Sequence, residues 1–427
     1  MAGPYYCDLA GTYADVTALT GAKGSGPGGL QAIIRGTGNA TALAAGETCY
    51  VKGTGNLTRL VKLTCGKDVS GWALGQTVVD NGGGATWGGL VCQLSVGANT
   101  AVILVELDIG DDEDLIVLAN GINNTTAADT TTLSAKSCDG IQIDTASGDD
   151  STGSIQIIGT DASYVYDGTT QAVLDGNGDA TNCIYSTTFY FWTLKNITVK
   201  SATGANISYI FCQYWVFWHC LSLDAGGDGF EADYRSWGAM FLFSITDNAG
   251  SEGIHCGGDY NTIYGCLVRS ATSYGVNGLY LRAPNLLHSC VYENGNDGVR
   301  IHCYASGTGI IGNVFADNTQ SGIMFDPTTP YGQSNVVIGN RITGNGNYGA
   351  EIDVDRKDTN IEDYNVFEGN TNGDLLNIVS GEHSCGDGAN HVADPADDGF
   401  VDSANDDYNV ASGKEIRSTA IVLNWHD

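Results

Sequence analysis

The chain of 427 residues contains 60 glycines, about 14 per cent against the ~7 per cent typical of proteins, but only 6 prolines, which excludes collagen. A hydrophobic content of 42% excludes a disordered linker, and the abundance of glycine, Asn, Thr and Ser predicts β-structure with many turns. The formal net charge of −31 disfavours binding to nucleic acid or to anionic membrane surfaces, but is compatible with cations such as calcium.

The first third of the chain contains no recognisable targeting segment. The N-terminal MAGPYYCDLAG lacks the basic and then apolar layout of a signal peptide, and no run of about 18 apolar residues predicts a membrane-inserted span.

The 13 cysteines are scattered without a CxxC pair, so we expect most of them to be unpaired and buried. Residues 66–136 read as alternating strands with glycine turns, which predicts an inserted β-subdomain.

A repeat with a period near 24 residues begins at residue 228. Segments such as DGFEAD, SEGIHCGG, DGVRIHCY and SGIMFD recur, and their glycines are separated by 24, 22, 23, 24, 27 and 24 residues. Residues one and three positions after each glycine are mostly apolar, and those two and four positions after it are mostly polar. This alternation predicts one strand per repeat, with one face in the core and the other in water. The repeated glycines are Gly229, Gly253, Gly275, Gly298, Gly322, Gly349 and Gly373.

A column of small polar or thiol residues, about nine positions before each glycine, supports the same register. A further row of asparagines follows at Asn318, Asn345 and Asn370. Such rows suit side-chain amides that stack coil over coil, so the repeat predicts a parallel β-helix in which each coil packs on the next. The first column comprises Asn196, Cys220, Ser244, Cys266, Cys290, Asn313, Asn340 and Asn365.

The chain resembles the right-handed parallel β-helix, or pectate-lyase-like, superfamily. The matching segments are GPYYCDLAG…GGLQAI…LAAGETCYVKGTG, GSIQIIGT…AVLDGNG and HVADPADDGFVDSANDDYNVASG. The resemblance implies an all-β fold, a right-handed single-stranded parallel β-helix with a β-rich insertion near the N-terminus. Residues 1–65 would then form the N-terminal cap and first coil, 66–136 the insertion, 137–413 the β-helix and 414–427 a C-terminal cap strand. Sugar lyases, hydrolases, epimerases and phage tailspikes share this fold, so it does not decide the activity.

Outward-facing polar residues of the later coils form the candidate catalytic site. His302, Asp326 and Asp353 stand four positions after the repeated glycine, and Arg300 and Glu351 lie in the neighbouring outward column. Stacked coils are ~4.8 Å apart, so these side chains are expected to be neighbours. Adjacent carboxylates raise one another's pKa, as an acid/base pair for glycosidic cleavage requires. A cation held between the carboxylates is one alternative, and the solvated outer face of an acidic protein is another.

Aromatic residues concentrate between residues 185 and 243. Consecutive aromatics cannot all point inward, because alternation along a strand sends every second side chain outward. We therefore expect a glycan-stacking band or a subunit interface, with core stacks as the alternative. The candidate glycan-binding residues are Trp192, Trp215, Trp218, Tyr234 and Trp237.

Calcium is the one candidate cofactor. Asp353, Asp355 and Asp358 imitate the start of a calcium loop. The segment lacks the glycine at loop position 6 and the Glu at position 12, which rejects an EF-hand and leaves a surface calcium ion as the hypothesis.

Three functions are compatible with these patterns. The first is a non-catalytic virion or extracellular structural protein, such as a tailspike, fibre or capsid spike, whose rigid β-helix binds a polysaccharide or cell-surface glycan. The second is a polysaccharide lyase or glycoside hydrolase acting on the outer groove of the β-helix. The third is a subunit of a self-assembling extracellular filament, because solenoids can stack end to end. We favour the first, and expect a homo-oligomer or larger assembly.

Overall fold

The structure is a computed structural model that describes the chain in segments. It divides into two compact units, Met1–Ser208 and Tyr209–Asp427, and each is described by itself. The helical residues described include no segment long and apolar enough to cross a membrane. The described residues are 4–11, 23–36, 42–57, 60–65, 69, 72, 77–80, 88–95, 100–105, 114–118, 129–137, 140–233, 235–278, 284–301, 307–326, 335–352, 361–363, 365–376, 400–402 and 407–410.

The first unit begins with parallel strands and a short helix. Strand β1 pairs with both β2 and β3. Helix α1 has Pro27 in its first turn, where the missing N–H costs no hydrogen bond, and ends at Gly36, whose φ of 69° favours glycine. Arg35 in its last turn forms an ion pair with Asp144. The bounds are β1 (Tyr5–Asp8), β2 (Lys23–Ser25), α1 (Gly26–Arg35), β3 (Thr48–Lys52) and β4 (Thr54–Asn56).

Residues 60–137 contribute a closed antiparallel sheet in the order β10-β5-β8-β7-β6-β9. The predicted β-subdomain at 66–136 corresponds to most of it. Strand β5 precedes that boundary, however, and pairs with β8 and β10 instead of joining a coil. The bounds are β5 (Leu60–Cys65), β6 (Thr77–Asp80), β7 (Gly88–Ser95), β8 (Thr100–Val105), β9 (Asp114–Leu118) and β10 (Asp129–Ser137).

Parallel coils make up the rest of the first unit. Strand β12 pairs with β3 and β15, β13 pairs with β4 and β16, and β11 pairs with β14. The coil that β3 and β4 begin is therefore continued by residues beyond the closed sheet. The bounds are β11 (Ile141–Ile143), β12 (Ile155–Gly159), β13 (Ala172–Asp175), β14 (Ile184–Thr187), β15 (Trp192–Lys195), β16 (Ile197–Lys200) and β17 (Ile207–Ile210), the last at the boundary between the units.

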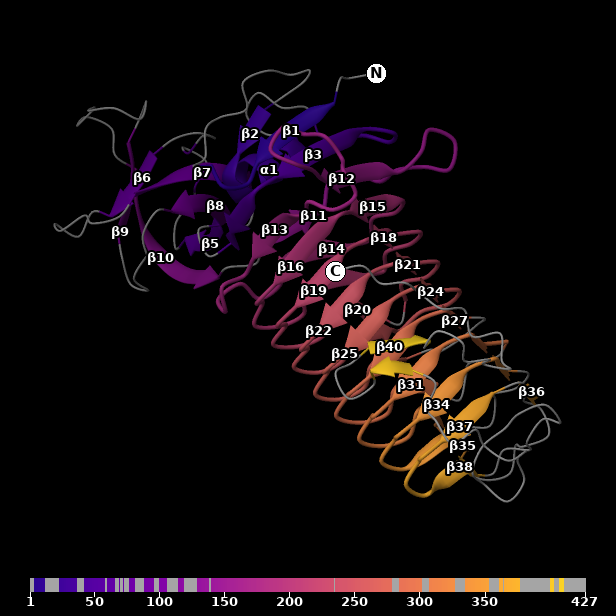
Figure 1. Cartoon of the computed structure of the whole chain (residues 1–427). Coiled ribbons are helices and arrows are strands. Elements are labelled where there is room, and N and C mark those ends of the chain that lie inside the picture. Colours follow the sequence, from indigo (N-terminus) through magenta and orange to yellow (C-terminus); the bar gives the residue numbers. More distant parts are fainter. Residues whose placement is uncertain are drawn as a thin grey trace. The chain divides into compact units, whose positions relative to one another are not determined.

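The second unit is a parallel β-solenoid in which successive coils add one strand to each of three sheets (Figure 1). The first sheet contains β18 (Val216–Trp218), β21 (Met240–Leu242), β24 (Thr262–Tyr264), β27 (Asn285–Leu287), β30 (Gly309–Ile311), β33 (Val336–Ile338) and β36 (Ile361–Asp363). The second contains β19 (Leu221–Leu223), β22 (Ile245–Asp247), β25 (Leu267–Arg269), β28 (Cys290–Tyr292), β31 (Val314–Ala316), β34 (Arg341–Thr343) and β37 (Val366–Glu368). The third contains β20 (Phe230–Ala232), β23 (Ile254–Cys256), β26 (Val276–Asn277), β29 (Val299–Ile301), β32 (Ile323–Phe325), β35 (Tyr348–Ile352) and β38 (Gly373–Leu376).

Register in the third sheet follows the glycine repeat. Phe230 pairs with Ile254, Ile254 with Val276 and Val276 with Val299, so each residue that follows a repeated glycine meets its counterpart on the next coil. All four side chains are fully buried. The predicted inward row is therefore confirmed for these coils.

The predicted register is wrong by one residue at the last strand of this sheet. Ala350 pairs with Leu375, and Glu351 pairs with Leu376. Leu375 was expected in the outward position, two residues after Gly373, but it stands opposite the inward Ala350. Gly373 lies opposite Tyr348, one position before the repeated Gly349 of the previous coil, so the glycine is displaced and the strand keeps its place.

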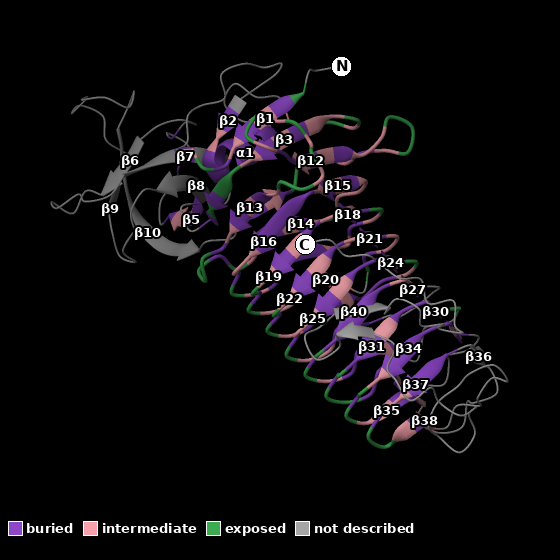
Figure 2. Cartoon of the chain, in the orientation of Figure 1, coloured by how far each residue is buried: buried purple, intermediate pink, exposed green. Residues whose placement is uncertain are grey.

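Two ladders of buried asparagines join the coils. Asn318 Nδ2 donates to Asn345 Oδ1 over 2.9 Å, and Asn345 Nδ2 donates to Asn370 Oδ1 over 2.9 Å. Asn294 extends this row by donating to Asn318 Oδ1 over 2.8 Å. Figure 2 shows the strands of these coils as mostly buried, with exposed residues in the turns. The expected stacking of side-chain amides is confirmed, and a parallel ladder runs through Asn313, Asn340 and Asn365.

In the ladder that includes Asn313, Asn340 and Asn365, one position is occupied by a different residue than predicted. Ser289 donates its backbone N–H to Asn313 Oδ1, and its Oγ accepts from the Cys266 N–H, so Ser289 takes the place assigned to Cys290. Cys290 instead pairs with Val314 in the second sheet. The thiols behave as predicted in the part of the chain that is described: the cysteines there that are buried and form no disulfide are Cys7, Cys49, Cys65, Cys183, Cys212, Cys220, Cys256, Cys266 and Cys290.

Aromatic rings fill the core of the first coils of the second unit. Phe217 stacks on Phe241 with ring centroids 5.0 Å apart, and Tyr209 stacks on Trp215 at 5.6 Å. Strand alternation holds here, because Trp215 and Phe217 are fully buried while Trp218 is 38% exposed.

The described C-terminal strands do not continue the coils. Strands β39 (Phe400–Asp402) and β40 (Asp407–Val410) pair with each other in antiparallel orientation, although both fall within the predicted β-helix at 137–413. The predicted cap strand at 414–427 lies outside the described residues.

Candidate functional site

The outer side of the third sheet carries two columns of polar side chains, here called the polar face. One column, at the centre of each strand, comprises direct register partners. The other column lies one residue before each repeated glycine. The polar face consists of Glu231, His255, Asn277, Arg300, Met324 and Glu351 in the first column and Asp228, Glu252, Tyr274, Asp297 and Ser321 in the second.

Glycine separates the two columns because the coils approach closely there. A Cβ on Gly229 would lie 2.5 Å from the carbonyl oxygen of Gly253, and one on Gly298 would lie 2.7 Å from that of Gly322. A side chain at these positions would clash with the backbone of the next coil. The repeated glycines thus allow the tight stacking that brings side chains of successive coils together.

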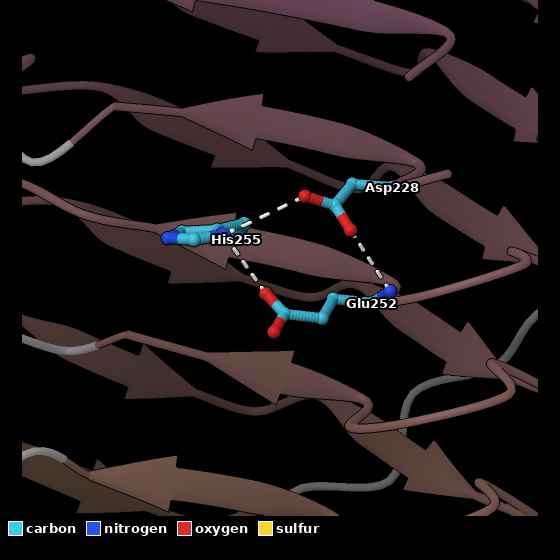
Figure 3. Close-up of side chains that lie close together, drawn as sticks. All are labelled: Asp228, Glu252 and His255. Atoms are coloured by element: carbon cyan, nitrogen blue, oxygen red, sulfur yellow. Dashed lines mark hydrogen bonds and ion pairs between the residues drawn. The ribbon is translucent and has the colours of Figure 1, made fainter. Parts of the chain in front are cut away.

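At one end of the polar face, two carboxylates converge on a histidine (Figure 3). His255 Nδ1 lies 2.9 Å from Glu252 Oε2 and 3.5 Å from Asp228 Oδ2. The Glu252 backbone N–H donates to Asp228 Oδ1 over 3.0 Å, and Asn277 Nδ2 donates to Glu252 Oε1. The three groups supply metal-ligand atoms that all lie within 4.8 Å of one another.

Further along the polar face, an arginine joins two neighbouring coils. Arg300 donates to Asp326 Oδ2 over 2.5 Å and also to the Tyr274 hydroxyl. Its guanidinium lies 5.0 Å from the centroid of the Tyr274 ring. The Asp326 side chain is only 3% exposed, so its negative charge is compensated by a largely buried ion pair.

A second carboxylate pair follows on the next coils. Asp297 Oδ1 accepts the Ser321 N–H over 2.9 Å, the same coil-to-coil hydrogen bond that Asp228 makes with Glu252. Glu351 accepts from the Ser321 hydroxyl over 2.7 Å and from Asn347 Nδ2 over 2.9 Å.

The surroundings shift two of these pKa values. Burial alone would lower the pKa of His255, but the contacts and charges of Asp228 and Glu252 outweigh it and raise that pKa to about 10. Burial raises the pKa of Asp297 to about 6, and the negative charges of Glu351 and Asp326 add to this, against the Ser321 hydrogen bond and Arg300. The face therefore combines a cationic imidazole with a carboxyl that holds a proton in mildly acidic solution.

The structure brings together part of the predicted catalytic group. Arg300 and Asp326 form an ion pair, and Glu351 lies on the same face two strands from Arg300, with Met324 between them. Their catalytic roles stay predictions. His302 and Asp353 of that group, and Asp355 and Asp358 of the calcium hypothesis, lie outside the described residues.

The aromatic prediction needs a correction. Trp192 and Trp215 are fully buried, so neither indole presents a face to a glycan; strand alternation turns both rings into the core. Trp218 is 38% exposed and Trp237 is partly exposed, so glycan stacking by these two stays a prediction. Tyr234 lies outside the described residues.

Sequence reasoning missed the column that precedes the glycines. It assigned no site role to Asp228, Glu252, His255 or Asp297, although the first three form the tightest group of metal-ligand atoms among the described residues. The alternation of apolar and polar residues was followed from each repeated glycine onward, so the residue before the glycine was not considered. The signal was the recurrence of an acidic residue directly before glycine in DGF, EGI and DGV.

Comparison with known proteins identifies the architecture. Residues 252–392 match the family model described as "Right handed beta helix region". The fold is that of a right-handed parallel β-helix. The match falls on the solenoid of the second unit and includes most of the polar face. No curated protein matches the chain in sequence.

Solved structures similar to this β-helix protein have diverse names. Pectate lyase Pel9A is 17% identical with a TM-score of 0.45, over 61% of this chain and 70% of that one. The mannuronan C-5 epimerase AlgE4 A-module of Azotobacter vinelandii is 17% identical with a TM-score of 0.39, over 58% and 79%. PfbA, a surface adhesin of Streptococcus pneumoniae, is 13% identical with a TM-score of 0.40, over 58% and 76%. At these identities the likeness concerns the fold alone.

Proposed function

We propose that this β-helix protein is a non-catalytic component of a virion or cell exterior that binds a polysaccharide along the polar face. The observation that carries the proposal is the register: side chains of successive strands, hydrogen-bonding except for Met324, stand side by side on one outer face. An extended polymer of sugars presents hydroxyl groups at regular intervals, and a regular row of donors and acceptors matches that repetition.

The chemistry of the face suits binding more directly than cleavage. Arg300 is held by Tyr274 and Asp326, and such a fixed guanidinium offers directional donors to hydroxyl or carboxylate groups. Asp228 and Glu252 add carboxylate oxygens to the same face, where both lie beside His255.

Replacing Arg300 tests this proposal. We expect Arg300→Gln to weaken binding to a responsive glycan, found by screening the full chain on a glycan array, by about tenfold in calorimetry, because a charged hydrogen-bond donor is lost. Arg269→Gln is the matched control, since Arg269 forms the same kind of ion pair and tyrosine contact, with Asp247 and Tyr292, on the second sheet. Equal losses in both variants, or no glycan bound at all, would contradict the proposal.

The virion or extracellular location is part of the same proposal. The described cysteines are buried and form no disulfides, which supports folding in a reducing cytoplasm, where proteins that assemble into virions inside the host fold. A location outside the cell suits a protein whose ligand is a cell-surface glycan.

We also propose that copies of this chain associate, through the outward side of the first sheet. Trp218, Leu242, Tyr264, Leu287, Ile311 and Ile338 are register partners there, here called the apolar row. Trp218 is 38% exposed and Ile311 is 36% exposed. An uncharged row on an acidic protein is a surface where two copies meet without direct charge repulsion. End-to-end stacking into a filament is the alternative form of assembly.

A glycan-cleaving function is the second candidate, and one observation favours it. Asp297 is 8% exposed with a pKa raised to about 6, which is the property of a general acid, while Glu351 on the same face serves as the second carboxylate. If the protein cleaves a glycan, Asp297→Asn should lower turnover by about 100-fold or more, whereas Asp247→Asn on the second sheet should not. Product release would be measured by reducing-end or unsaturated-sugar assays. A glycan that binds without turnover leaves the first candidate standing alone.

A further inference from the structure

Three ligand atoms meet at the start of the polar face in a way that the glycan proposal does not require. They are Asp228 Oδ2, Glu252 Oε2 and His255 Nδ1, and they lie within 4.8 Å of one another. We propose that Asp228, Glu252 and His255 bind a divalent transition-metal ion of the Zn²⁺ type. This inference is independent of glycan binding.

The carboxylates are held in place by contacts that leave one oxygen of each directed at the imidazole. Asp228 Oδ1 accepts the Glu252 N–H over 3.0 Å, and Glu252 Oε1 accepts from Asn277. Figure 3 shows the remaining oxygens pointing toward His255 Nδ1. Such outer contacts orient ligands in metal sites, and here they come from the backbone and from the next coil.

Glu252 supplies a second and independent indication. Glu252 is 9% exposed, and its Oε2 atom is buried. This oxygen accepts no hydrogen bond of regular geometry, although it lies 2.9 Å from His255 Nδ1 in an ion pair. A buried carboxylate oxygen without an aligned donor is costly, and a metal ion satisfies it without directional constraint from an N–H bond.

The distances suit a small tetrahedral ion. Bonds of 2.0–2.2 Å to nitrogen and oxygen place tetrahedral ligand atoms about 3.3 to 3.6 Å apart. The two nitrogen–oxygen separations here are 2.9 and 3.5 Å, so only small side-chain movements are needed. The imidazole nitrogen favours Zn²⁺ and its neighbours over Ca²⁺, which takes six to eight oxygen ligands.

Such an ion would join two coils and keep one position open. Asp228 precedes β20, whereas Glu252 and His255 belong to the next coil, so the metal would cross-link neighbours in the solenoid. Three protein ligands leave a fourth tetrahedral position for water or a sugar hydroxyl, and the His255 side chain is 28% exposed. Nδ1 must lose its proton to coordinate, so metal and proton compete for this nitrogen.

Titration of the metal-free full chain with Zn²⁺ tests the inference. We expect calorimetry to show a site whose affinity falls by about 10- to 100-fold in His255→Gln, Glu252→Gln and Asp228→Asn. His288→Gln is the matched control, because His288 is a described histidine that packs against Tyr264 and is not a member of the cluster. Asp228→Asn retains an oxygen for the Glu252 amide and should therefore fold.

A stability measurement separates a specific site from incidental binding. Zn²⁺ should raise the melting temperature of the unmodified chain and of the His288 variant through mass action, but not that of the three ligand variants. Zn²⁺ affinity and melting shifts that are unchanged in all three variants would overturn the proposal, because the ion would then bind elsewhere. Circular dichroism of each variant without metal verifies that its fold is intact.

Discussion

Asp297 differs from Asp228, Glu252 and Asp326 in that it has no ion-pair partner among the described residues. Asp228 and Glu252 share a histidine, and Asp326 has an arginine, whereas Asp297 makes no ion pair among the described residues. Burial is the largest influence on it, with nearby negative charges adding to the effect. Burial without an ion-pair partner thus disfavours the charged form of Asp297.

This imbalance predicts a pH-dependent stability. The pKa of Asp297 rises from 3.8 to about 6 on folding, so its contribution is fully present below about pH 4 and is lost as the pH rises to about 6. The effect is on the order of 2 to 3 kcal/mol. Asp297→Asn should remove this decline, and urea unfolding of both proteins between pH 4 and pH 7 measures it.

A parallel series with Asp247→Asn provides the control, because Asp247 is on the second sheet and is paired with Arg269. Identical pH profiles for the unmodified chain and Asp297→Asn would show that this carboxyl does not titrate as described.

At the scale of the element, strand and ladder positions were predictable where one period governs them. The inward row at Ile254, Val276 and Val299 follows from alternation, and the asparagine ladder follows from a repeated residue type. The exchange of Ser289 for Cys290 was not predictable, because both are small residues that fit the column. The slip at Leu375 was not predictable from the glycine repeat, because Gly373 lies opposite Tyr348 and not opposite Gly349.

The site was less predictable than the fold for a physical reason. Neighbouring side chains on the polar face come from a turn position and a strand position, which follow different geometric rules. The contact between Arg300 and Asp326 was predictable, because both residues belong to the outward columns that follow the repeated glycine. Asp228 reaches His255 because the glycine between the columns lets the coils stack closely, a contact that the alternation of apolar and polar residues does not express.

The asparagine ladder predicts a large penalty for one substitution. Asn318 is 1% exposed, donates to Asn345 and to the Val291 carbonyl, and accepts from Asn294. Asn318→Ala leaves these buried partners unsatisfied, so we expect a loss of about 2 to 4 kcal/mol in the free energy of unfolding.

Asn372→Ala is its control, since Asn372 donates to Asn347 at an exposed position and should cost below about 1 kcal/mol. Chemical denaturation measures both. Similar losses at the two positions would mean that the ladder adds no more than a surface hydrogen bond.

At the scale of the whole molecule, charge and surface pattern act together. A net charge of −31 keeps copies apart in dilute buffer, while the apolar row offers one uncharged line of contact in the second unit. Association should therefore strengthen as salt screens the repulsion.

Light scattering at low and high salt tests the assembly. Replacing Trp218 and Ile311 together with serine should lower the average mass at high salt toward that of one chain, because both side chains are exposed in the apolar row. Val165→Ser serves as the control, since Val165 is 57% exposed and is not a member of the row. Unchanged assembly in the double variant would place the contact elsewhere.

Coils of different length in this solenoid keep the same strand register. Val299 and its partner Ile323 are 24 positions apart, whereas Ile323 and its partner Ala350 are 27 apart, yet all three stand in one inward row. The three additional residues fall between strands and leave the pairing on either side unchanged. We therefore expect the fold to tolerate a foreign peptide inserted after β32. This β-helix could then serve as a scaffold that displays an inserted sequence at a chosen coil.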